Sequence, residues 1–120
     1  MYYEVAGAGQ PLVLIHAGIA DSRMWDDQFD VFAEHYRVVR FDARGFGNSS
    51  MPAGAFSYSE DLYELLRFLE IERAYVLGVS MGGGTAIDLA LTHPDIVAAL
   101  IPVASALDGY AYAEDPKEAE

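Results

Sequence analysis

Short runs of apolar residues alternate along this chain with segments in which apolar residues recur at helical spacing. A continuous apolar run is typical of a strand buried on both faces, and helical spacing is typical of an amphipathic helix. The expected strands are Met1–Val5, Leu12–His16, Tyr36–Asp42, Ala74–Val79 and Ile96–Ala104, with Pro102 interrupting the last. The expected helices are Arg23–His35, Met81–Thr92 and a segment that begins at a cap, Ser57 or Ser59, and ends near Glu70.

The alternation of strands and helices predicts an α/β fold with a mostly parallel sheet of about five strands flanked by helices. In such a sheet, ligands and catalytic groups lie at the carboxyl ends of the strands. Three of these ends carry polar or glycine-rich segments, namely His16–Gly18, Asp42–Gly47 and Val79–Met81. The sequence therefore predicts a site built from these three loops.

Gly78-x-Ser80-x-Gly82 joins the fourth expected strand directly to the last helix. A strand that turns at once into a helix holds one residue in a strained conformation, and the residues two positions away must be small where the elements pass. This is the pattern of a nucleophile elbow, which exposes a serine hydroxyl above the sheet beside a helix N-terminus. The alternative is a tight strand-to-helix turn whose serine has no chemical role.

Composition and charge narrow the choice of partners. The 120 residues are 52% hydrophobic and carry 19 acidic against 7 basic side chains, for a net charge of -12. This charge argues against nucleic acid and against anionic membranes as partners. The chain has no cysteine, which excludes disulfides and thiolate metal sites. Because the sequence shows neither a secretory leader pattern nor an apolar run of membrane-spanning length, the expected location is the cytoplasm.

The three loops together resemble the α/β-hydrolase superfamily, specifically its esterase and lactonase-like branch. The motifs that carry the resemblance are Leu14–Gly18, Asp21–Trp25, Asp42–Ser49, Gly78–Gly83 and Thr92–Asp95. Any one of these motifs is weak evidence. Their order along the chain and their positions on the expected elements make the combination specific, and it covers nearly the whole chain.

The resemblance implies that Ser80 is the nucleophile of a serine hydrolase whose substrate is a small ester or a related acyl compound. The backbone N–H groups of Met81 and Gly18 would form the oxyanion hole, and no metal or organic cofactor is implied. In this family the catalytic acid follows the serine in the chain and the histidine comes last. Asp108 stands near the position where a minority arrangement places the acid.

The resemblance requires a catalytic histidine downstream of Ser80, and no histidine there stands in a suitable position. His16 is expected to be a buried structural residue, and His35 to interact with solvent or with a helix dipole. His93 ends the helix that starts at Ser80, so it lies roughly 18 Å from the serine at about 1.5 Å per residue and cannot be the base. The catalytic centre is therefore expected to be incomplete in this sequence.

The chain resembles only the N-terminal half of a hydrolase. Residues 1–108 are expected to form a partial core, and residues 109–120 an acidic C-terminal tail. Ile96–Ala104 would then lie at an open sheet edge, and one sheet face would be covered by Arg23–His35 alone. Exposed apolar surface of this kind promotes association, so a homo-oligomer is expected.

Two other functions stay open at this stage. A non-catalytic binding or assembly module on the same fold would keep its function when Ser80 is replaced by alanine. A nucleotide-binding domain would cradle phosphate with Gly45–Gly47 or Gly82–Gly84. The second alternative is weak, because the first loop is not followed at once by a helix, the Gly-Lys-Ser/Thr pattern is absent, and the chain is acidic.

Overall fold

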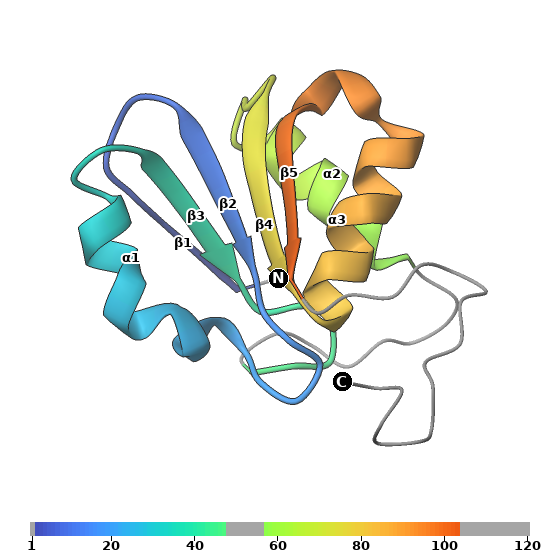
Figure 1. Ribbon diagram of the computed structural model, residues 1–120, viewed down its shortest axis with the longest axis horizontal. Helices are drawn as coiled ribbons and strands as arrows, with labels where there is room; N and C mark the ends of the chain where they lie inside the picture. Colours follow the sequence, from blue (N-terminus) through green and yellow to red (C-terminus); the bar gives the residue numbers. More distant parts are fainter. Residues whose placement is uncertain (1, 48–56, 104–120) are drawn as a thin grey trace, which may run out of the picture.

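The computed structural model describes residues 2–47 and 57–103. One five-stranded sheet has the order β1-β3-β2-β4-β5, in which β1 is antiparallel to β3 and the other neighbours are parallel (Figure 1). The strands are β1 (Tyr3–Ala6), β2 (Pro11–Ile15), β3 (Arg37–Phe41), β4 (Ala74–Val79) and β5 (Val97–Val103). The α-helices are α1 (Asp26–Phe32), α2 (Tyr58–Phe68) and α3 (Met81–Thr92), and the 3-10 helices are η1 (Ser22–Trp25) and η2 (Pro94–Ile96). The expected mostly parallel α/β sheet is confirmed.

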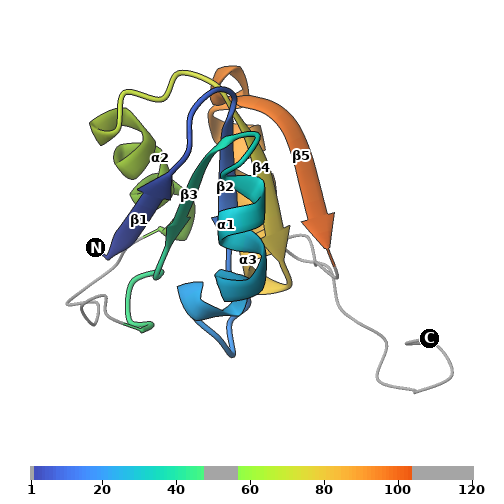
Figure 2. The same cartoon turned by 90° about the vertical axis from the view of Figure 1, so that its left-hand side faces the viewer.

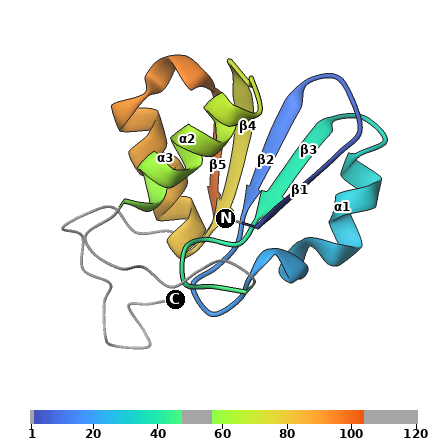
Figure 3. The same ribbon diagram turned by 180° about the vertical axis from the view of Figure 1, so that it is seen from behind.

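Helices cover both faces of the sheet (Figure 2). α2 and α3 pack side by side on one face, whereas α1 lies on the other (Figure 3). Along β2, Val13 and Ile15 belong to the core under α2 and α3, and Leu12 and Leu14 belong to a smaller cluster beneath α1. Because both faces of β2 are covered, every position of this run is apolar, as the pattern predicted.

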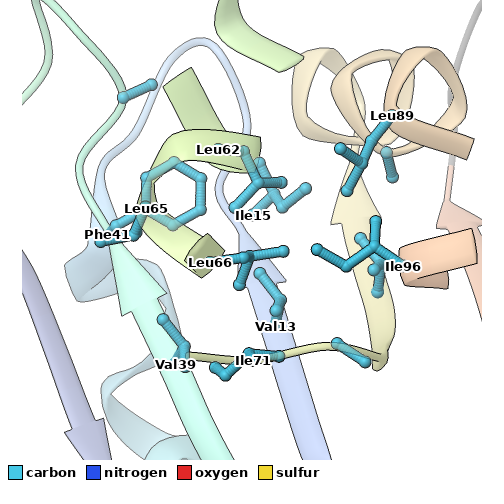
Figure 4. Packing of buried hydrophobic residues seen from close by; sticks show 14 residues of the cluster. Val13, Ile15, Val39, Phe41, Leu62, Leu65, Leu66, Ile71, Leu89 and Ile96 are labelled. Carbon is cyan, nitrogen blue, oxygen red and sulfur yellow. The ribbon is translucent and has the colours of Figure 1, made fainter. Parts of the chain in front are cut away.

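The larger core forms between the sheet and α2 (Figure 4). Leu62, Leu65 and Leu66 recur on one face of α2 and are buried. Ser57 caps this helix, because its hydroxyl accepts a backbone N–H from the first turn at 3.3 Å. Of the two serines that the sequence left open, Ser57 is therefore the cap, and Ser59 is buried within the first turn.

The helix expected over Arg23–His35 is shorter than predicted and divided in two. Trp25 has φ of -97° and ψ of 6°, which separates η1 from α1. α1 ends at Phe32, whose carbonyl oxygen accepts the Tyr36 N–H at 2.9 Å in a turn that leads into β3. The predicted helix end at His35 is wrong, because the chain must already reverse there to enter the sheet.

β5 lies at the edge of the described sheet, as expected, and Pro102 continues this strand instead of interrupting it. The Val103 C=O accepts the Ser80 N–H at 2.8 Å, so Val103 faces β4. The backbone N–H and C=O groups of successive residues in a strand point to opposite sides. The backbone of Pro102 therefore points to the open edge, and its missing N–H removes no hydrogen bond to β4. Leu100, Ile101 and Val103 are 37%, 45% and 44% exposed. Association of copies through this strand stays a prediction.

Candidate active site

The turn between β4 and α3 holds Ser80 in a strained backbone conformation. Its φ of 55° and ψ of -114° lie where residues with a side chain are rarely found. The residue is exposed, its N–H donates to Val103 at 2.8 Å, and its C=O accepts the Gly84 N–H at 3.1 Å. A serine hydroxyl is therefore exposed at the carboxyl end of β4, next to the first turn of α3. The strain that the sequence predicted at Ser80 is confirmed.

Two glycines allow β4, β2 and α3 to approach one another around Ser80. A Cβ atom on Gly78 would overlap the carbonyl oxygen of Gly82. A Cβ atom on Gly82 would lie 2.5 Å from the carbonyl oxygen of Ile15 in β2. Both obstacles are backbone atoms, which cannot rotate aside as a side chain can. The predicted need for small residues on both sides of the serine is confirmed.

The loop that follows β2 lies against the start of α3. A Cβ atom placed on Gly18 would lie 3.3 Å from both Cβ and Sδ of Met81. These two residues are therefore packed against each other, and Ser80 directly precedes Met81 in the chain. The structure brings together the proposed nucleophile and the two residues proposed as oxyanion donors. The roles of the Met81 and Gly18 N–H groups as oxyanion donors stay predictions.

His16 orients the peptide group that carries the Gly18 N–H. The imidazole is fully buried, its Nε2 accepts the Ala43 N–H at 2.9 Å, and its Nδ1 lies 2.8 Å from the Ala17 carbonyl oxygen. Since Nε2 is an acceptor, the ring is neutral and Nδ1–H donates to that carbonyl. The Ala20 N–H donates to the same oxygen at 3.1 Å. In a trans peptide the N–H points away from the C=O, so these two donors set the direction of the Gly18 N–H.

Asp42 connects the glycine-rich loop after β3 to the start of η1. Its side chain is buried and accepts the Ser22 N–H at 2.7 Å. A Cβ atom on Gly47 would overlap this carboxylate, so only glycine fits there, with φ of 50°. Arg44 donates to both carboxylate oxygens of Asp61 in α2, at 3.0 and 2.7 Å. The sequence motif contained Asp42 but carried no signal for its contact with Ser22, which lies 20 positions away.

The remaining candidates lie away from Ser80 or outside the described residues. His35 is exposed in the turn after α1. His93 ends α3, lies 2.8 Å from a Glu60 carboxylate oxygen, and stacks on a tyrosine ring with centroids 3.6 Å apart. The full length of α3 separates His93 from Ser80, which agrees with the exclusion of His93 as the catalytic base. Asp108, the candidate acid, and the acidic tail over 109–120 lie outside the described residues.

Charged groups at the end of the loop that follows β2 are paired. The Asp21 carboxylate accepts hydrogen bonds from the Arg23 guanidinium at 2.7 Å and from the Arg23 backbone N–H at 2.9 Å. These bonds lower the pKa of the Asp21 carboxyl to about 2.

Within residues 2–47 and 57–103, no three His, Cys, Asp or Glu side chains are grouped to hold a metal ion. The same part of the chain contains no helix with the length and apolarity needed to cross a bilayer.

The strain at Ser80 predicts an effect on stability. Replacing Ser80 with glycine is expected to raise the free energy of unfolding by about 1 kcal/mol, since strain of this kind costs about 1–3 kcal/mol and glycine loses more chain entropy on folding. Ser80→Ala keeps the Cβ atom and is the matched control, with an expected change within about 0.5 kcal/mol. Urea denaturation of the three proteins measures both effects. Equal stability of the two variants would contradict strain at this position.

Comparison with known proteins decides the family. A family profile described as the alpha/beta hydrolase fold matches residues 10–119, which is most of the chain. The chain belongs to the α/β-hydrolase family. The resemblance that the motif loops indicated is thereby confirmed.

This α/β-hydrolase chain has relatives among curated proteins and among solved structures. It is 41% identical over 88 residues to a putative non-heme chloroperoxidase from Synechocystis sp. The matched segment covers 70% of this chain and 32% of that protein. A hydrolase from Pseudomonas aeruginosa PA01 superposes with a TM-score of 0.82 at 36% identity, over 95% of this chain and 43% of that one. Est816, described as an N-acyl homoserine lactone degrading enzyme, superposes with a TM-score of 0.83 at 34% identity, over 87% of this chain and 41% of that one. The chain spans less than half the length of these relatives.

Proposed function

We propose that this chain carries the nucleophile and the oxyanion hole of a serine hydrolase that acts on small carboxylic esters or related acyl compounds. The observation that carries this proposal is the exposed Ser80 in its strained turn, directly beside the contact between Gly18 and Met81. Relatives that are named as a hydrolase and as a lactone-degrading enzyme support the same reaction class. Acyl transfer of this kind needs a nucleophile, oxyanion donors and a base, so the proposal includes no cofactor.

In the proposed reaction, the Ser80 hydroxyl oxygen attacks the acyl carbon while a base takes its proton. The carbonyl oxygen becomes an oxyanion and accepts the N–H groups of Met81 and Gly18. Because both donors are held before the substrate arrives, each would contribute about 3–4 kcal/mol of transition-state stabilisation. Collapse of the intermediate releases the alcohol with a proton and leaves an acyl-serine. Water then attacks this ester with the help of the same base, which releases the acid and restores the serine.

Proton transfer requires a group that the described residues do not supply. All three histidines of the chain lie within the described ranges, and His16 already uses both ring nitrogens. His35 and His93 lie in a distant turn and at the far end of α3. The proposal therefore places the acid and the base outside the described residues, with Asp108 as the candidate acid. The relatives are longer than this chain, and the proposed base corresponds to a part of the relatives that lies outside the match.

Covalent labelling with a fluorophosphonate, with imidazole added as an external base, tests this proposal. We expect one probe per chain by intact mass, on Ser80, and labelling about tenfold faster or more when imidazole is present. A positioned general base contributes roughly 100- to 10,000-fold, so a free base is expected to restore part of that effect. Ser80→Ala is expected to remove the adduct. Ser57→Ala, which removes another exposed serine hydroxyl, is the matched control and is expected to keep it.

Two outcomes would contradict the proposal. Equal labelling of Ser80→Ala and the unaltered chain would place the reactive group elsewhere. Absence of an adduct on Ser80 at every imidazole concentration would mean that the turn does not activate its serine. That second result would favour the non-catalytic binding or assembly module, whose function does not depend on Ser80.

A further inference from the structure

A methionine sulfur holds the loop between β2 and η1, which contains the proposed donor Gly18 and is called the oxyanion loop below. The Ala17 N–H donates to the Met24 Sδ at 3.3 Å. Ala17 is buried and directly precedes Gly18, whereas Met24 lies in η1. A buried N–H group needs a hydrogen-bond acceptor from the protein, because water does not reach it, and this thioether serves as that acceptor. One of the peptide groups that shape the loop is therefore fixed by a sulfur atom.

The same methionine is accessible to solvent. Met24 is 37% exposed, and it borders a shallow surface pocket of about 560 Å³, open to solvent, together with Gly18, Ile19 and Phe46. A small oxidant can therefore reach this side chain from the space next to the oxyanion loop. Thioethers are oxidised to sulfoxides, and enzymes that reduce the sulfoxide make this change reversible.

We propose that Met24 is an oxidation site through which hydroperoxides disturb the oxyanion loop. The sulfur attacks the terminal oxygen of the hydroperoxide, an S–O bond forms and the O–O bond breaks. The sulfur loses two electrons, and the departing oxygen takes the proton to leave as an alcohol, or as water from hydrogen peroxide. The consequence for catalysis rests on the proposed hydrolase function, whereas the change in the loop does not.

Oxidation changes both the position and the strength of the acceptor for the Ala17 N–H. A thioether sulfur has two lone pairs, and oxidation converts one of them into an S–O bond. The strong hydrogen-bond acceptor is then the oxygen, one bond away from the sulfur. The sulfoxide is also polar and bulkier than the thioether. The Ala17 N–H must therefore move or lose its partner, and the Gly18 N–H shifts with it because the two are neighbours in a short loop.

A second methionine provides an internal comparison. The Met81 Sδ lies 3.3 Å from the position of a Cβ atom on Gly18, so this side chain packs against the loop. Met81 is only partly exposed, and its sulfur is a packing contact instead of the acceptor of the Ala17 N–H. Replacing Met81 with leucine therefore leaves the proposed oxidation site in place, whereas replacing Met24 with leucine removes it.

The test uses the full chain, labelled with ¹⁵N and treated with hydrogen peroxide. Peptide mass mapping reports oxidation at each of the four methionines, and NMR reports the backbone amide signals of Ala17 and Gly18. We expect Met24 sulfoxide to form and both amide signals to shift, in the unaltered chain and in Met81→Leu. In Met24→Leu, peroxide is expected to leave both signals unmoved. Treatment with methionine sulfoxide reductases A and B is expected to restore the original signals.

Imidazole-assisted labelling of Ser80 gives the catalytic readout. Peroxide is expected to slow labelling about tenfold or more in the unaltered chain, a part of the roughly 100- to 1,000-fold effect of losing an oxyanion donor. Met24→Leu is expected to keep its own untreated rate. If Ser80 is not labelled before treatment, the proposed function fails, and the NMR measurement decides the oxidation site alone. The inference is overturned if Met24 stays a thioether while other methionines are oxidised, or if its sulfoxide leaves both amide signals in place.

Discussion

Replacing Gly82 with alanine is expected to lower the free energy of unfolding by about 3 kcal/mol or more, which is a large part of a small domain's stability. The added Cβ atom would lie 2.5 Å from the carbonyl oxygen of Ile15 and 2.6 Å from that of His16. Neither oxygen can retreat, because Ile15 ends β2, which is held between β3 and β4, and the buried His16 follows it directly. α3 would have to move away instead, and its first turn would carry Ser80 and Met81 out of place.

Gly18→Ala is the matched control for Gly82→Ala. The atoms nearest to a Cβ on Gly18 belong to the Met81 side chain, at 3.3 Å, and a methionine side chain can adopt another rotamer. Its expected cost is below about 1 kcal/mol. Urea denaturation followed by circular dichroism measures both variants. A Gly82→Ala protein as stable as the unaltered chain would mean that β2 and α3 are further apart than the structure places them.

Replacing Leu66 with alanine is expected to lower the free energy of unfolding by about 2–5 kcal/mol. Leu66 is fully buried in α2 and belongs to the core that Val13 and Ile15 form on the sheet (Figure 4). Truncation removes apolar contacts and leaves a cavity, which the sheet on one side and the helix backbone on the other cannot fill. The loss should appear as a lower urea midpoint with an unchanged slope, as expected when stability alone is altered.

Leu91→Ala makes the same chemical change at an exposed helical position. Leu91 lies in α3 and is 74% exposed, so its truncation opens no cavity. Alanine also has a slightly higher helix propensity than leucine, and the expected change is within about 0.5 kcal/mol. If the two variants lost equal stability, the packing of α2 on the sheet would not be the source of the effect at Leu66.

Local patterns were sufficient to predict most of the elements and the turn at Ser80. The predicted bounds of β4 and α3 agree with the structure, and those of β2 differ by one residue at each end. The geometry of a buried strand or of a tight turn restricts which residue types can stand there. An apolar run and a pair of glycines around a serine can therefore be recognised from neighbouring residues alone. The turn itself made Ser80 a candidate site residue, whereas Met81 and Gly18 were proposed only from the resemblance to the α/β-hydrolase family.

Element ends were harder to predict where distant segments decide them. The helix expected to reach His35 ends at Phe32, since the chain must turn there to bring Arg37 into the sheet beside β2. Pro102 was expected to interrupt its strand, but the strand continues because this proline faces an open edge. Both outcomes depend on which strands are neighbours, and propensity contains no information about that.

The order of the strands and the hydrogen bonds that hold the loop after β2 were decided by the tertiary structure alone. An apolar pattern shows that β2, β3 and β4 are buried, but several orders of these strands would bury the same side chains. The His16–Ala43 bond joins residues 27 positions apart, and the Met24–Ala17 bond crosses from η1 back to the loop. These partners meet only after the sheet and its helices have assembled. Residue types therefore indicated candidate site residues, whereas long-range packing decided which groups fix the loop beside Ser80.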